Sequence, residues 1–156
     1  MIERERRFLV DRLPDDLAVG SAIVQGYLMT RPASVRVRRR DDTCTLTIKT
    51  GSGRKRTEIE RAIDGDEFEA LWNVATELRI AKRRVLVPLD DGHMAELDLF
   101  EGALTGRRMV EVEFDTDEAA EAFSSPDWFG REVTEDARFT NASLARNGWP
   151  TDEPPG

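Results

Sequence analysis

The sequence is poor in the residues that many hydrolytic and redox sites require. Its 156 residues include a single cysteine, Cys44, and a single histidine, His93. One cysteine cannot form a disulfide within the chain, and the pair cannot supply the spaced ligands of a zinc site. His93 follows Asp90-Asp91-Gly92, which is typical of a turn between strands, so Ser-His-Asp or Cys-His catalysis is not expected.

Long apolar segments are also missing. No run of about 20 apolar residues occurs, so a transmembrane helix is not expected. The first ten residues, MIERERRFLV, lack the apolar core of a signal peptide, which predicts a cytoplasmic location. The length fits one domain, which we expect to span residues 1–147, followed by a disordered tail at 148–156.

Charge is abundant and unevenly distributed. The chain has 23 Lys and Arg against 31 Asp and Glu, a net charge of −8. Positions 31–61 carry ten basic and four acidic residues, whereas positions 90–136 carry fifteen acidic and three basic ones. Because the basic segment has no interleaved aromatic residues and the protein is acidic overall, nucleic-acid binding is not expected.

The dominant period of the sequence is two, which is typical of β-strands. Eight strands are predicted, at residues 2–10, 22–30, 34–40, 43–50, 55–63, 79–88, 94–100 and 108–115. Helices are predicted at residues 67–76, 117–123 and 141–146. We therefore expect a mainly β fold of the α+β class, built as an antiparallel barrel or strongly curved sheet with a few helices packed outside.

One face of nearly every predicted strand is formally charged. This face carries eight acids and eight bases: Glu3, Glu5, Glu58, Glu60, Glu96, Asp98, Glu111 and Glu113, with Arg7, Arg36, Arg38, Arg40, Lys49, Arg56, Lys82 and Arg84. Carboxylates two residues apart on a strand lie about 7 Å apart, where their repulsion costs roughly 2 kcal/mol. Divalent cations would offset that repulsion and leave the bases free for a polyanion, although an ordinary solvated face remains an alternative.

Nine short segments resemble, in order, those of the CYTH proteins, the triphosphate tunnel metalloenzymes. They are Glu3-x-Glu5-x-Arg7, Gln25-Gly26-Tyr27-Leu28, Val35-Arg36-Val37-Arg38, Leu46-Thr47-Ile48-Lys49, Arg56-Thr57-Glu58-Ile59-Glu60, Glu96-Leu97-Asp98, Val110-Glu111-Val112-Glu113, and residues 128–134 and 136–141. Together they span positions 2–144, and the length suits the compact bacterial tripolyphosphatase branch. Arg7 and Arg131 stand where the family pattern has lysine.

The resemblance implies an eight-stranded antiparallel tunnel with a charged lumen, a triphosphate substrate, Mg²⁺ or Mn²⁺, and a possible homodimer, with no nucleic-acid or membrane partner. The basic residues would bind substrate: Arg7, Arg36, Arg38, Lys49, Arg56, Lys82 and Arg84. The metal ligands would be Glu3, Glu5, Asp98, Glu111 and Glu113, and the residues of the reaction itself Glu5, Glu58, Glu60 and Tyr27.

The leading functional prediction is metal-dependent hydrolysis of inorganic triphosphate to pyrophosphate and phosphate. Within the same family, the alternatives are an adenylate cyclase of the class IV type and a thiamine or nucleoside triphosphatase. From other classes, the alternatives are a non-catalytic polyphosphate-binding module and an acidic protein-interaction module. The sequence contains no segment that we can read as an adenine pocket.

Overall fold

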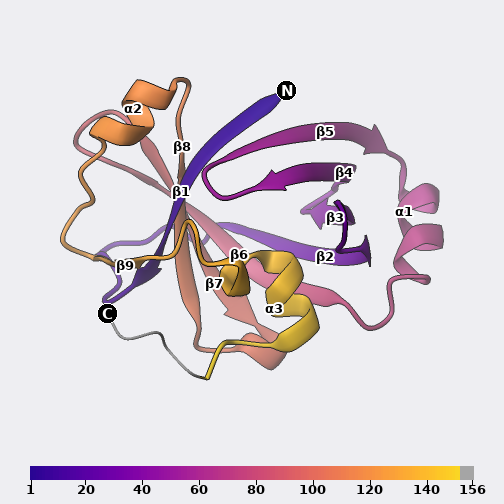
Figure 1. Ribbon diagram of the computed structural model, residues 1–156. Helices are drawn as coiled ribbons and strands as arrows, with labels where there is room; N and C mark the ends of the chain where they lie inside the picture. Colours follow the sequence, from indigo (N-terminus) through magenta and orange to yellow (C-terminus); the bar gives the residue numbers. More distant parts are fainter. Residues whose placement is uncertain (152–156) are drawn as a thin grey trace.

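Nine antiparallel strands form one sheet that closes on itself, and the helices pack against its outside and across one end (Figure 1). The computed structural model describes residues 1–151, so the part of the predicted tail at 152–156 lies outside the described residues. The strands are β1 (Ile2–Val10), β2 (Ser21–Met29), β3 (Ser34–Arg40), β4 (Thr43–Ser52), β5 (Lys55–Ile63), β6 (Arg79–Pro88), β7 (Met94–Glu101), β8 (Arg108–Glu113) and β9 (Phe129–Glu132). The helices are α1 (Gly65–Trp72), α2 (Asp117–Ala122) and α3 (Asn141–Asn147), with 3₁₀ turns η1 (Gly102–Leu104) and η2 (Ala137–Phe139).

The sheet order is β5-β4-β3-β2-β6-β7-β8-β1-β9, and an additional pairing between β5 and β1 closes the barrel. This closing seam is short, because Ile2, Glu3 and Arg4 are the residues of β1 that pair with β5. Farther along β1, Phe8 and Val10 pair with β9 instead. β1 therefore changes its neighbour on one side along its length, which makes it both the closing strand and the support of β9.

The predicted eight-stranded antiparallel barrel is confirmed, and β9 is an additional strand that the period did not indicate. Each of the eight predicted strands is present, with ends that differ by at most two residues. Every strand pairing is antiparallel, as expected for strands joined mostly by short turns. Within residues 1–151, no helix combines the length and apolarity needed to cross a membrane.

α1 covers the outer face of β3 and β4 but is shorter than the predicted helix at 67–76. It begins after Asp64, whose side chain accepts from the Glu67 backbone N–H at 2.8 Å while Glu67 Oε1 accepts from the Asp64 N–H at 2.9 Å. It ends at Trp72, where the Arg79 guanidinium donates a hydrogen bond to the Trp72 carbonyl oxygen at 2.8 Å. A side chain from the next strand thus satisfies a carbonyl that a longer helix would have used.

An apolar layer lies outside the barrel on the side of β1, β8 and α2. Phe8, Phe114, Phe123 and Phe129 form its buried aromatic centre. The His93 ring packs edge-on against Phe114 with ring centroids 5.0 Å apart, so the single histidine serves this outer core rather than the barrel interior.

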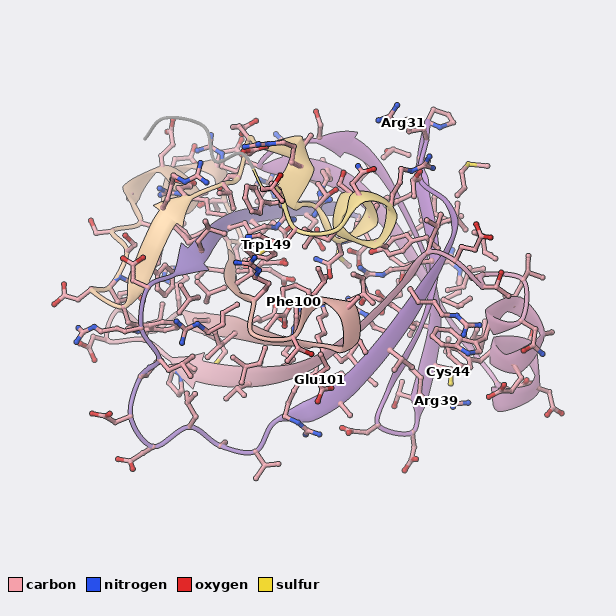
Figure 2. The ribbon with its side chains drawn as sticks, turned by 90° about the horizontal axis from the view of Figure 1, so that it is seen from below. Arg31, Arg39, Cys44, Phe100, Glu101 and Trp149 are labelled. Atoms are coloured by element: carbon pink, nitrogen blue, oxygen red, sulfur yellow. The ribbon has the colours of Figure 1, made fainter. Side chains whose placement is uncertain are left out.

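Another apolar cluster fills one end of the barrel interior. It combines inward-facing strand residues, including Tyr27 and Phe100, with Phe139 from η2 and Leu144 from α3. Trp149, after α3, extends this cluster by packing against Phe100, with ring centroids 6.2 Å apart (Figure 2). The C-terminal segment therefore closes an apolar end of the lumen and leaves the other end to the charged side chains.

Candidate functional site

The charged strand faces enclose a cavity of about 250 Å³ inside the barrel. Every sequence-predicted site residue except Asp98 lines it, namely Glu3, Glu5, Arg7, Tyr27, Arg36, Arg38, Lys49, Arg56, Glu58, Glu60, Lys82, Arg84, Glu111 and Glu113. Strand register explains this convergence, because residues paired across neighbouring strands point to the same face of the sheet. Glu5 is directly opposite Glu113 in the β1–β8 ladder, and Lys49 is opposite Glu58 in the β4–β5 ladder.

Three carboxylates gather at one wall of the cavity. Glu3, Glu5 and Glu113 each offer an oxygen, and these atoms all lie within 4.8 Å of one another. Burial and the charge of Glu111 raise the pKa of Glu5 to about 8. Burial and the charge of Glu96 raise the pKa of Glu113 to about 7. The positive charges nearby therefore do not fully balance these acids.

This carboxylate cluster suits a hard divalent cation. Carboxylate oxygens are the ligands that Mg²⁺ and Mn²⁺ prefer, and three of them from two adjacent strands converge here. A bound cation would also lower the raised pKa values of Glu5 and Glu113 by favouring their ionised forms. The residues present therefore fit a metal site, with Glu3, Glu5 and Glu113 as the donors.

A row of arginines on β3 forms a wall with the opposite charge. Arg36, Arg38 and Arg40 line the cavity at alternate positions, and within residues 1–151 none of the three has a carboxylate within 4.0 Å. Burial, together with the charges of Arg36 and Arg84, lowers the pKa of Arg38 to about 9. Uncompensated guanidinium groups at this density favour a bound polyanion, since phosphate oxygens match their donor geometry.

The remaining bases are held between acids. Arg7 donates to Glu5 at 2.9 Å and lies 3.6 Å from Glu111, and its charge keeps the pKa of Glu111 well below its ordinary value despite burial. Lys49 lies 3.1 Å from Glu3 and 3.4 Å from Glu58. Arg56 contacts both Glu3 and Glu5. These three bases bridge the acidic wall to the rest of the lumen. Beside them, the Thr47 hydroxyl donates to Glu60 at 3.3 Å.

Asp98 is the predicted site residue that the structure does not bring to the cavity wall. It is 1% exposed, and Arg84 donates to its two carboxylate oxygens at 2.8 and 2.9 Å. Lys82 lies 2.7 Å from the same carboxylate, and both cations keep the pKa of Asp98 low against the effect of burial. Asp98 thus sits behind the two bases and fixes their position, with both oxygens already engaged.

Lys82 is the most enclosed base of the site. It is 1% exposed, and burial lowers its pKa to about 7, although the Asp98 carboxylate acts in the opposite direction. Its ammonium group also donates to Asn141 Oδ1 at 2.9 Å. The Asp98 carboxylate already favours the charged ammonium form, and a bound anion would favour it further.

The cavity also contains residues that the sequence did not assign to the site. Asn141 lines it from α3, and Gln25, buried on β2, contacts it through hydrogen bonds to Tyr27 and Arg38. Gln25 shares its strand face with Tyr27, so alternation could have identified it. No periodic signal indicates Asn141, because its helix is short and enters the lumen from the end of the barrel.

The curated relatives found by comparison with known proteins share one description. No family model matches the sequence. The chain is 43% identical over 147 residues to an inorganic triphosphatase of Nitrosomonas europaea, covering 93% of this chain and 97% of that protein. It is 36% identical over 149 residues to an inorganic triphosphatase of Acetivibrio thermocellus, covering 93% and 94%. A crystal structure of an inorganic triphosphatase superposes with a TM-score of 0.69 at 41% identity, covering 92% of this chain and 93% of that one.

Proposed function

The chain belongs to the inorganic triphosphatase family, and from this premise we propose that its barrel cavity binds inorganic triphosphate and hydrolyses it to pyrophosphate and phosphate. The curated relatives match along nearly their full lengths, so the proposal concerns the whole barrel rather than one segment. The nine segments that resemble CYTH proteins support the same assignment and the compact bacterial tripolyphosphatase type. A homodimer remains a prediction of that resemblance.

One observation carries the proposal: a row of arginines without carboxylate partners and a cluster of carboxylates line the same small cavity. Arg36, Arg38 and Arg40 lack carboxylate partners within the described chain, while Glu3, Glu5 and Glu113 converge in the same lumen. Three successive phosphoryl groups would satisfy the arginines. Phosphoryl transfer requires mainly positioning and charge neutralisation, which such a cavity supplies.

The bases divide into two groups by their partners. Arg36 and Arg38 are available for direct contact with phosphate oxygens. Lys82 and Arg84 are fixed from behind by Asp98, at 2.7 and 2.8 Å, so their remaining hydrogens can be presented to a ligand at little further cost in entropy. We therefore assign Asp98 the role of positioning these two bases, rather than that of a metal ligand.

The proposed cofactor is Mg²⁺ or Mn²⁺, held by Glu3, Glu5 and Glu113. When bound, the ion would neutralise charge on the phosphate oxygens and polarise the phosphoryl group. Glu111 lies beside this cluster and pairs with Arg7, so it stays a further candidate ligand.

Hydrolysis adds water across the terminal phosphoanhydride bond. The water oxygen forms a bond to the terminal phosphorus, the bond to the bridging oxygen breaks, and pyrophosphate leaves. The proton released by the water needs an acceptor, for which the cavity carboxylates Glu5, Glu58 and Glu60 are the candidates. The buried Tyr27 hydroxyl lines the same cavity and can hydrogen-bond to the reacting groups.

The test is a comparison of phosphate release from tripolyphosphate, ATP and thiamine triphosphate, with Mg²⁺, with Mn²⁺ and with EDTA. We expect tripolyphosphate to give the highest kcat/KM, and EDTA to abolish turnover. Faster turnover of ATP or thiamine triphosphate would contradict the substrate assignment. Cyclic AMP among the products would indicate a cyclase, and tight tripolyphosphate binding without turnover would indicate a polyphosphate-binding module.

A further inference from the structure

Two uncharged amide side chains lie among the charged groups of the cavity. Gln25, on β2, is 0% exposed, and Asn141, the first residue of α3, is 8% exposed. Burying an amide side chain destabilises the fold unless its polar atoms form hydrogen bonds. Their partners therefore show what this pair contributes.

The two amides join three functional groups into one network. Gln25 Nε2 donates to the Tyr27 hydroxyl oxygen at 2.9 Å and to Asn141 Oδ1 at 3.3 Å. Gln25 Oε1 accepts from Arg38 Nε at 3.1 Å. Asn141 Oδ1 also accepts from the Lys82 ammonium at 2.9 Å. The arginine, the lysine and the tyrosine of the cavity are thus all connected through uncharged side chains.

The chemistry of the partners fixes the direction of every bond in this network. A guanidinium group, and an ammonium group paired with a carboxylate as Lys82 is with Asp98, can only donate, so the amide atoms facing Arg38 and Lys82 must be the oxygens. The Gln25 amide nitrogen then has to point towards Tyr27 and Asn141, and it donates one hydrogen to each. The Tyr27 oxygen is therefore an acceptor in its bond to Gln25.

A hydroxyl that accepts from one side keeps its own hydrogen for another partner. Tyr27 lines the cavity, and within residues 1–151 its hydroxyl donates to no other group. Its free hydrogen is consequently available to a ligand in the cavity. The network thus makes Tyr27 a hydrogen-bond donor, which is the role that phosphate oxygens require.

We propose that Gln25, supported by Asn141, is a positioning residue for the reaction: its amide turns the Tyr27 hydroxyl into a donor towards the bound phosphate and holds Arg38 and Lys82 in the same network. This inference rests on the proposed function and adds the residues that orient the groups contacting substrate. It also gives α3 a part in the site, because Asn141 extends the network from the C-terminal segment into the lumen.

A spectroscopic test needs no turnover, because Tyr27 is the one tyrosine of the chain. Protein labelled with [13Cζ]tyrosine would give one NMR signal, recorded with EDTA, without and with inorganic tripolyphosphate. We expect the ligand to shift this signal in the wild type. Gln25→Met should move the signal of the free protein and reduce the ligand-induced shift, whereas Asn147→Ala, at the exposed end of α3, should change neither.

A kinetic test separates positioning from a merely structural role. We expect Gln25→Met to lower kcat by about 10–100-fold, as for the loss of an oriented hydrogen-bond donor. In a Tyr27→Phe background the same substitution should lower kcat by less than about threefold, because the hydroxyl is already gone and only the contact with Arg38 remains to be lost. Gln25→Glu should lower kcat similarly and also raise KM, since the new carboxylate accepts from the Tyr27 hydroxyl and neutralises Arg38.

The outcomes distinguish this inference from the proposed function. Equal losses of kcat in the two backgrounds, or an unchanged Tyr27 signal in folded Gln25→Met protein, would overturn the positioning role. If Gln25→Met does not fold, as judged by its thermal unfolding transition, Gln25→Glu keeps the side-chain volume and carries the same signal test. A wild-type protein that binds tripolyphosphate, shows the expected signals and does not hydrolyse it would refute the triphosphatase function alone.

Discussion

At the scale of single residues, the arginines of β3 act differently on the two faces of the strand. Arg36 points into the lumen, 8% exposed, and its Nε has no hydrogen-bond partner within the described chain. Arg39 lies on the outer face beside α1, 3.0 Å from Glu69 and over the Phe68 ring at 4.4 Å (Figure 2). We therefore expect the inward arginines to bind the ligand, whereas the outward one contacts other parts of the protein.

The pair Arg36→Met and Arg39→Met tests this distinction. For Arg36→Met we expect KM for tripolyphosphate to rise about 10–100-fold, because a charge-assisted contact is lost. The ligand-free protein should become more stable by about 0.5–2 kcal/mol, since a buried uncompensated charge is removed. Arg39→Met should leave KM unchanged and lower the stability only slightly, because its contacts with Glu69 and Phe68 lie at the surface. Denaturant unfolding and steady-state kinetics give both quantities, and a less stable Arg36→Met protein would contradict the argument.

Glu5 makes stability depend on pH. Its pKa is about 8 in the folded protein and 4.5 without the fold, so between these values the folded state binds more protons than the unfolded state. Stability therefore decreases as pH rises through this range, by on the order of 1 kcal/mol per pH unit. Above pH 7 the lowered pKa of Lys82 acts with the opposite sign, so the window to measure is pH 5–7.

We expect the melting temperature of the metal-free protein to fall from pH 5 to pH 7, and the affinity for Mn²⁺ to rise, because the carboxylates must lose protons to bind. Glu5→Gln should flatten the first dependence and weaken Mn²⁺ binding. Glu118→Gln, an exposed position on α2, should change neither. Differential scanning fluorimetry and calorimetric Mn²⁺ titration are the measurements, and a melting temperature that rises over this interval would refute the sign.

At the scale of elements, the sequence predicts the strands better than the ends of the barrel. Alternation identifies a strand because one face is buried against protein and the other is charged. β9 has four residues and is ordered by pairing with Phe8 and Val10 of β1, so its own pattern carries little information. Period two gives the face of a strand residue but not its depth, so it placed Asp98 on the charged face without showing that Asp98 lies behind Lys82 and Arg84. It does not apply to Asn141, which begins a helix.

The closed end of the lumen depends on η2 and α3. Leu144 is 2% exposed and packs in the same cluster as Phe139 and Tyr27. Leu144→Ala should therefore destabilise the protein by about 2–5 kcal/mol through the cavity it leaves. Asn147→Ala, on the exposed end of the same helix, should stay within about 0.5 kcal/mol of the wild type. Urea unfolding measures both, and equal effects would show that α3 does not pack as described.

At the scale of the whole molecule, the number of paired residues between neighbouring strands differs around the barrel. The β1–β5 seam has three register pairs, starting with Ile2 opposite Thr57, whereas β6 and β7 share eight. Glu3 belongs to the seam and also to the carboxylate cluster with Glu113 of β8. A ligand that engages this cluster would therefore connect the seam to the strands beside it.

We expect amide hydrogen exchange to be faster at the seam, residues 2–5 and 54–57, than in β6 and β7 of the ligand-free protein. Mn²⁺ with tripolyphosphate should slow exchange at the seam by more than it does in β6 and β7, because the bound state favours the closed barrel. Mass spectrometry of peptic peptides gives the comparison. Uniform protection of all strands on ligand addition would argue against a weak seam.

The row of arginines without carboxylate partners also has a practical consequence for handling the protein. Sulfate, citrate and inorganic phosphate have oxygens that can accept hydrogen bonds from Arg36, Arg38 and Arg40. We therefore expect these anions, in a purification or storage buffer, to compete with tripolyphosphate for the cavity. Apparent KM values would then drift with the history of a preparation. Zwitterionic or Tris buffers with chloride as the counterion leave the row accessible, and dialysis between the two conditions would reveal how firmly an incidental anion is retained.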